Sequence, residues 1–213
     1  MKNSPNDKSF FMGRVTASVA HELQNVLAII RETAGLMQDF MMMGDACQDF
    51  ENRLSTGLAS IKNQVSRGVG LTQGLNRFAH TADHLHCPID IRDILDRLVL
   101  LTERMARNKG FSLSLAPGAS HTINHDPVAF QTLCFLCLEA LEQTLPSGQA
   151  LVITPESPGK GARIGFACPG LPMDSAPLIR TWPNWNDLAE ACCQYGVELS
   201  LTDTCPGICL GFP

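Results

Sequence analysis

Residues 14–30 read RVTASVAHELQNVLAII, and the spacing of apolar side chains here decides the first half of the fold. In this stretch and its flanks the apolar residues recur at intervals of three, four or seven, at Met12, Val15, Val19, Leu23, Val26, Ile30, Met37 and Met41. At about 100° per residue these positions fall on one side of an α-helix. The sequence therefore predicts a helix over residues 8–42 that carries His21 on its exposed side.

The residues that share the face of His21 are small or polar, and they are Arg14, Ala17, Ser18, Asn25, Ala28 and Glu32. Glu22 follows the histidine directly, and Asn25 lies one turn further along the same face. A single histidine on a helix is usually just solvated. The small neighbours nevertheless leave this imidazole open to a partner, so we expect the face to be a docking surface.

The heptapeptide HELQNVL, residues 21–27, resembles the H-box of two-component histidine kinases, whose pattern is His-Glu-x-x-Asn-Pro-Leu. Val26 replaces the proline of the family, so this helix should lack the usual kink. The resemblance implies that His21 accepts a phosphoryl group. Glu22 is then the candidate carboxylate that holds the other ring N–H, and Asn25 the candidate amide that orients a water molecule.

A second amphipathic helix is predicted over residues 49–82, after a turn at residues 43–48. Its apolar positions have the spacing of a bundle seam, and they are Leu54, Leu58, Ile61, Val65, Leu75 and Ala79. A lone hairpin cannot bury both apolar stripes, whereas two hairpins can do so in a four-helix bundle. We therefore expect residues 1–86 to be a homodimeric phosphotransfer domain. Four glycines in this helix indicate either tight packing or local flexibility.

After residue 86 the pattern changes to short alternating elements. Strands are expected at 89–91, 111–115, 150–153, 162–167, 197–202 and 208–212, and helices at 92–109, 126–145 and 185–195. Asp126 and Pro127 form a helix start, and Gly110 a helix end. This order resembles the ATP-binding sandwich of histidine kinases. The predicted fold class is thus α+β, a long helical hairpin followed by a degenerate ATPase-like α/β sandwich over residues 87–213.

Three nucleotide contacts of that family are missing from the second domain. Phe135 and Glu139 stand where the magnesium-binding helix carries asparagines. Phe166 replaces the aspartate that reads adenine, and Cys168 replaces a glycine of the same motif. The glycine-rich lid is replaced by residues 181–185, TWPNW. We therefore expect no ATP binding and no cofactor of the protein's own, with Mg²⁺ supplied by a receiver partner.

Composition and charge exclude several classes of protein. The chain has 213 residues and a net charge of −5, which argues against a nucleic-acid partner. No apolar run approaches the roughly 18 residues of a membrane span, and no signal-peptide core is present, so a cytoplasmic protein is expected. Nine cysteines are interpreted as reduced and mostly buried. The group His80, His84, His86 and Cys87 is more often solvated than metal-bound, so no metal is expected.

These observations favour a histidine phosphotransferase that passes a phosphoryl group between His21 and the aspartate of response-regulator receiver domains. The same residues would serve a phosphatase or negative regulator, with Asn25 placing the water. A non-catalytic dimeric scaffold is the third reading. An active histidine kinase is the fourth, because it needs the missing nucleotide contacts.

Overall fold

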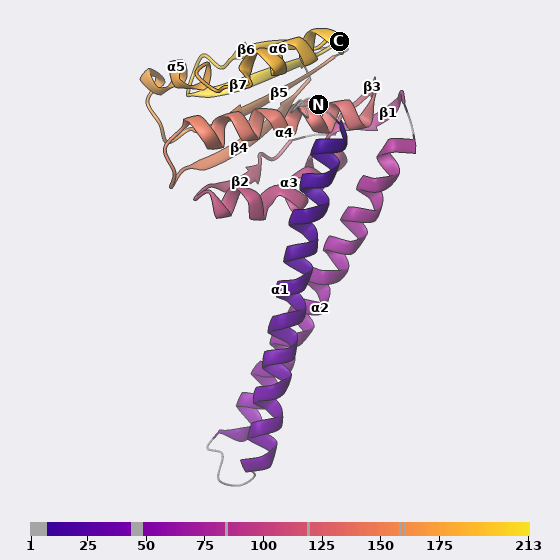
Figure 1. Cartoon of the computed structure of the whole chain (residues 1–213), viewed down its shortest axis with the longest axis vertical. Coiled ribbons are helices and arrows are strands. Elements are labelled where there is room, and N and C mark those ends of the chain that lie inside the picture. The colour runs from indigo at the N-terminus through magenta and orange to yellow at the C-terminus, as the bar shows by residue number, and fades with distance from the viewer. Residues whose placement is uncertain (1–7, 44–48, 84, 119, 158, 160) are drawn as a thin grey trace.

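The computed structural model describes residues 8–43, 49–83, 85–118, 120–157, 159 and 161–213. Two long antiparallel helices, α1 (Lys8–Met43) and α2 (Phe50–His80), form a hairpin that extends from an α/β unit (Figure 1). Both predicted helices are confirmed, and α2 ends in the short 3-10 helix η2 (Thr81–Asp83). Residues 44–48 of the predicted turn lie outside the described residues.

The two helices pack through the face that the apolar spacing indicates. Phe11, Val15, Val19 and Val26 are buried on α1, and the ring of Phe11 meets that of Phe78 on α2 edge to face at 5.3 Å. The glycines of α2 are mostly close-packing positions. A Cβ on Gly57 would lie 2.8 Å from the Met37 sulfur, and one on Gly74 would lie 3.1 Å from Leu100, whereas one on Gly70 would meet no atom within 4 Å.

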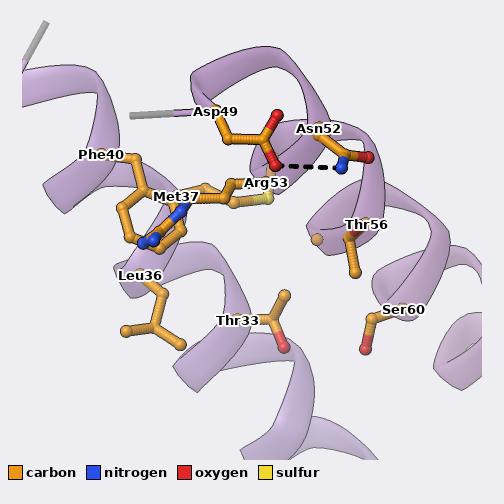
Figure 2. A pocket seen from close by; sticks show the side chains of 10 residues that line it. Thr33, Leu36, Met37, Phe40, Asp49, Asn52, Arg53, Thr56 and Ser60 are labelled. Carbon is orange, nitrogen blue, oxygen red and sulfur yellow. Dashed lines mark hydrogen bonds between the residues drawn. The ribbon is translucent and has the colours of Figure 1, made fainter. Parts of the chain in front are cut away.

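The far end of the hairpin holds an open apolar groove. Figure 2 shows Leu36, Met37 and Phe40 of α1 facing Thr56 and Ser60 of α2 across it. The guanidinium of Arg53 lies 5.2 Å from the centre of the Phe40 ring. The Asn52 amide donates a hydrogen bond of 3.0 Å to Asp49, which orders the start of α2.

The α/β unit follows from Cys87 onward. Its elements are β1 (Cys87–Asp90), α3 (Ile91–Asn108), β2 (Ser112–Leu115), β3 (Thr122–His125), α4 (Pro127–Thr144), β4 (Ala150–Glu156), β5 (Ala162–Ala167), η3 (Met173–Ser175), α5 (Ala176–Ile179), α6 (Trp185–Gln194), β6 (Glu198–Leu201) and β7 (Gly207–Phe212). Five strands form one sheet in the order β2-β4-β5-β7-β6, in which only β2 and β4 run parallel. Strands β1 and β3 form a separate antiparallel pair.

Helices α3, α4 and α6 form a layer on the sheet, with α4 in the middle because it packs against both of the others. The start of α1 crosses α4 on the side away from the sheet, so every residue of α4 from Pro127 to Leu141 is buried (Figure 1). This confirms the predicted α+β architecture, a helical hairpin followed by a mixed sheet with helices. Among the described helices, none is long and apolar enough to cross a membrane.

Candidate functional site

His21 lies near the middle of α1, level with α3, and its side chain is exposed. Its predicted neighbours Ala17 and Asn25 are exposed as well, and Ser18 and Ala28 are half-buried. Glu32 is exposed further along the helix. The imidazole is therefore accessible from solvent, on a helix surface where small side chains leave room for another protein.

Glu22 is buried, in contrast to the histidine beside it. Arg67 of α2 donates a hydrogen bond to its Oε1, and Nη1 of Arg104 on α3 lies 3.1 Å from its Oε2. A third guanidinium, that of Arg107, lies 3.7 Å from Oε1. The carboxylate that we expected to hold the His21 ring thus contacts arginines of two other helices, and its role toward the ring stays a prediction.

Arg14 is half-buried, and its role toward a partner stays a prediction. Its guanidinium forms an ion pair with Glu139 of α4, and it lies 5.2 Å from the centre of the Phe135 ring. Glu139 also accepts a hydrogen bond of 3.1 Å from Gln143. The Phe135 ring in turn packs 5.1 Å from that of Phe11. Phe135 and Glu139, the two residues at the expected asparagine positions, are therefore both covered by α1.

The other two altered nucleotide positions are filled from within the sandwich. Phe166 and Cys168 are buried, and burial raises the pKa of the Cys168 thiol to about 11. Between β5 and α6 the chain folds into η3 and α5 instead of a glycine-rich lid, and the indole N–H of Trp182 donates to Gln143 of α4 at 3.1 Å. Phe166, Cys168 and Trp182 thus pack against the protein itself in the region where the resemblance would place nucleotide contacts.

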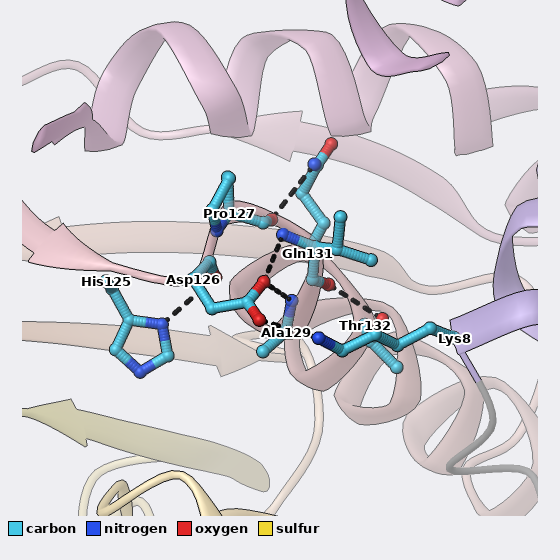
Figure 3. Close-up of polar contacts among 8 residues, drawn as sticks. Lys8, His125, Asp126, Pro127, Ala129, Gln131 and Thr132 are labelled. Atoms are coloured by element: carbon cyan, nitrogen blue, oxygen red, sulfur yellow. Dashed lines mark hydrogen bonds and ion pairs between the residues drawn. The ribbon is translucent and has the colours of Figure 1, made fainter. Parts of the chain in front are cut away.

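A second contact fixes the start of α1 on the sandwich. The Lys8 ammonium lies 2.6 Å from Asp126, whose carboxylate also caps α4 by accepting the N–H groups of Val128 and Ala129 at 2.9 Å (Figure 3). Burial would raise the pKa of Asp126. The hydrogen bonds from Lys8 and from the α4 backbone, together with the Lys8 charge, outweigh it and hold that pKa below its ordinary value.

Among the described residues, the histidines and cysteines outside residues 21–27 do not gather into a metal site. His80 pairs with Asp83 at 2.8 Å, the His86 ring lies 6.0 Å from that of His125, and His84 lies outside the described residues. Within the part of the chain that the structure describes, no group of three or more His, Cys, Asp or Glu side chains could hold a metal ion. The eight described cysteines are free, and half of them are buried, namely Cys134, Cys137, Cys168 and Cys192.

The arginines around Glu22 are the residues that sequence reasoning missed. The only signal for them was that Glu22 falls three residues after Val19 and four before Val26, inside the apolar stripe. A carboxylate at such a position needs cationic partners when it is buried. Arg67 and Arg104 are 45 and 82 positions away along the chain, so the sequence could not identify them.

No family model matches the chain. The C4-dicarboxylate transport sensor protein DctB of Rhizobium meliloti (strain 1021) is 29% identical over 133 residues, which are 62% of this chain and 21% of that protein. The chain thus spans about a fifth of the length of that curated relative.

Several solved structures are similar to the chain. A bacterial phosphotransferase is 16% identical, covering 96% of each chain at a TM-score of 0.47. Histidine kinase ThkA, in complex with the response regulator protein TrrA, is 18% identical over 98% of this chain and 63% of that one, at a TM-score of 0.46. At these identities and TM-scores the similarity supports no function by itself. A function has to rest on the side chains described above.

Proposed function

We propose that the protein is a histidine phosphotransferase, which exchanges a phosphoryl group between His21 and the aspartate of response-regulator receiver domains without binding ATP. The observation that carries this proposal is the combination of an exposed His21 with nucleotide positions filled by the protein's own side chains. Such a histidine can still react with an aspartyl phosphate that a partner brings.

The reaction is an in-line displacement at phosphorus. The unprotonated nitrogen of the neutral imidazole attacks, the N–P bond forms, and the P–O bond of the acyl phosphate breaks, so that the aspartate leaves as a carboxylate. The ring, which keeps the hydrogen on its other nitrogen, gains positive charge that a nearby carboxylate or water can stabilise. The Mg²⁺ that this step uses is expected in the acidic pocket of the receiver.

The direct test is to mix the purified protein with phosphorylated candidate receivers and to measure acid-labile phosphate on it. Labelling is expected for the wild type and for His80→Ala, whose imidazole is also exposed, and none for His21→Ala. Labelled His21→Ala protein would show that another side chain is the acceptor.

A phosphatase or negative regulator is the second candidate, favoured by the exposed amide of Asn25 one turn from His21. Hydrolysis needs a positioned water molecule, whereas transfer to the imidazole does not. Asn25→Ala should therefore slow the loss of receiver phosphate and leave labelling of His21 intact. If Asn25→Ala slowed hydrolysis of the receiver phosphate and transfer to His21 equally, Asn25 would have no separate role in hydrolysis.

We propose further that the protein does not bind nucleotide. Arg14 and Phe11 of α1 contact Glu139 and Phe135 of α4, and Phe166 is packed inside the sandwich. Calorimetric titration with Mg-ATP should give no binding heat up to millimolar nucleotide. Micromolar affinity would contradict this and favour the kinase reading.

A homodimer is proposed from apolar side chains left exposed along the hairpin. Leu27 of α1 is 64% exposed, and Leu58, Val65 and Val69 of α2 are 58%, 49% and 50% exposed. The three α2 residues follow one another at intervals of seven and four, which places them in one stripe. A second copy of the hairpin, packed as a four-helix bundle, would cover both helices.

A further inference from the structure

The arginine cluster beside His21, defined as Arg67, Arg104 and Arg107, carries more charge than its partners neutralise. Its buried partner is Glu22, and Glu103 at the rim lies 3.8 Å from Arg107. Among the described residues with an ion pair to this cluster, three guanidinium groups thus face two carboxylates. One positive charge is left over.

The surplus charge is loosely held and faces solvent. The side chains of Arg67 and Arg107 are 41% and 53% exposed, and both contacts of Arg107 exceed 3.5 Å. Nη1 of Arg104 is buried and makes no hydrogen bond of good geometry, although it lies 3.1 Å from Glu22. The Arg107 guanidinium can turn toward a stronger anion, because both of its contacts are long.

The cluster lies on the side of α1 adjacent to His21. Glu22 is the next residue, about 100° around the helix and 1.5 Å along it. Ser18, which shares the face of His21, lines the small cavity of about 30 Å³ that the arginines border. A phosphoryl group on His21 would therefore add about two negative charges next to the surplus cation.

We propose that the arginine cluster is an electrostatic site that stabilises the phosphoryl group on His21 and so sets how phosphate is shared between this protein and a receiver. Arg107 and Arg67 act on the phosphoryl group through their charge, and Glu22 neutralises part of that charge. This inference rests on the proposed function. It differs from an acid–base role of Glu22, because a catalytic group changes the rates of both directions and leaves the equilibrium unchanged.

The test is the equilibrium ratio of phosphorylated His21 to phosphorylated receiver, measured with one purified receiver and the full-length protein. Arg107→Gln and Arg67→Gln should lower this ratio by roughly threefold to tenfold, since each exposed pair is weak but the phosphoryl group carries about two charges. Glu22→Gln should raise it. All three shifts should shrink in 1 M salt, where the screening length falls to about 3 Å.

The matched control is Arg77→Gln, which removes an exposed guanidinium from the same helix about 15 Å beyond Arg67. It should leave the ratio at the wild-type value. If Arg67→Gln fails to fold, Arg107→Gln decides the question, because its contacts are long. A ratio for Arg107→Gln equal to that of Arg77→Gln, or a lowered ratio for Glu22→Gln, would overturn the inference. Wild-type protein that takes no phosphate from any receiver would instead overturn the proposed function.

Discussion

At the scale of single residues, Arg14 compensates the buried charge of Glu139. The carboxylate is buried at a position expected to carry asparagine, and it is balanced by the guanidinium from α1 and by the Gln143 amide. Removing one partner of a buried ion pair leaves the other charge without compensation, which costs more than the pair itself contributes. Arg14 is thereby a stability residue of the α1–α4 contact, whatever it does toward a partner.

Arg14→Ala is therefore expected to lower the free energy of unfolding by roughly 1–3 kcal/mol. Arg31→Ala, at an exposed position of the same helix, should change it by less than about 0.5 kcal/mol. Urea unfolding at equal protein concentration measures both values. Equal midpoints for the two variants would show that Glu139 is satisfied without Arg14.

Asp126 gives a prediction about pH. Its pKa is held below the ordinary value, so the stability that it contributes is present above about pH 4, the unfolded pKa, and is lost as pH falls through the folded pKa. Asp126→Asn keeps a good helix cap but loses the Lys8 ion pair, at a cost of up to about 1 kcal/mol at neutral pH. The stability gap between wild type and Asp126→Asn should close below about pH 4. A gap that stays constant down to about pH 2 would contradict the ion-pair explanation.

At the scale of elements, the sequence predicted what local chemistry determines. Asp126 and Pro127 start α4 as expected, and Gly110 adopts φ +83° at the end of α3, a conformation that favours glycine. Strand β3 was not predicted. Only four residues long, it is held in place by pairing with β1, some 35 positions earlier. A short strand with several polar residues lacks a sequence pattern that predicts it, because pairing with a distant strand is what makes it extended.

The exposed stripe of α2 gives a prediction at this scale. Leu58→Glu should convert the dimer to monomer, because burying a carboxylate in an apolar seam without a partner is strongly unfavourable. Asn63→Glu places the same charge at an exposed polar position of the helix and should leave the dimer intact. Light scattering at micromolar concentration distinguishes the two. A wild-type protein that is monomeric under these conditions would contradict the four-helix proposal.

At the scale of the whole molecule, three ion pairs from α1 are among the described contacts that join the hairpin to the sandwich. Lys8 pairs with Asp126, Arg14 pairs with Glu139, and Glu22 pairs with Arg104 of α3. Each contact links residues more than 80 positions apart, so the two parts could be predicted from the sequence but the way they meet could not. As a consequence α3 packs against α1 at Glu22, the residue next to His21. We therefore expect a partner that reaches the imidazole to approach along this edge.

The docking proposal can be tested on that face with one substitution. A receiver must bring its phosphorus within about 3–3.5 Å of the imidazole nitrogen, which requires small side chains around it. Ala17 is exposed one turn before His21, so Ala17→Arg should leave stability within about 0.5 kcal/mol of wild type while it blocks close approach.

Single-turnover transfer from a phosphorylated receiver should slow by at least about tenfold in Ala17→Arg. A misplacement of the reacting groups by about 1 Å can already slow a reaction by more than this. Gln38→Arg is the control, because it adds the same side chain at an exposed position of α1 about 25 Å from His21. A folded Ala17→Arg protein that transfers phosphate at the rate of Gln38→Arg would show that the receiver reaches His21 from another side of the helix. The small residues around His21 would then be an ordinary solvated surface.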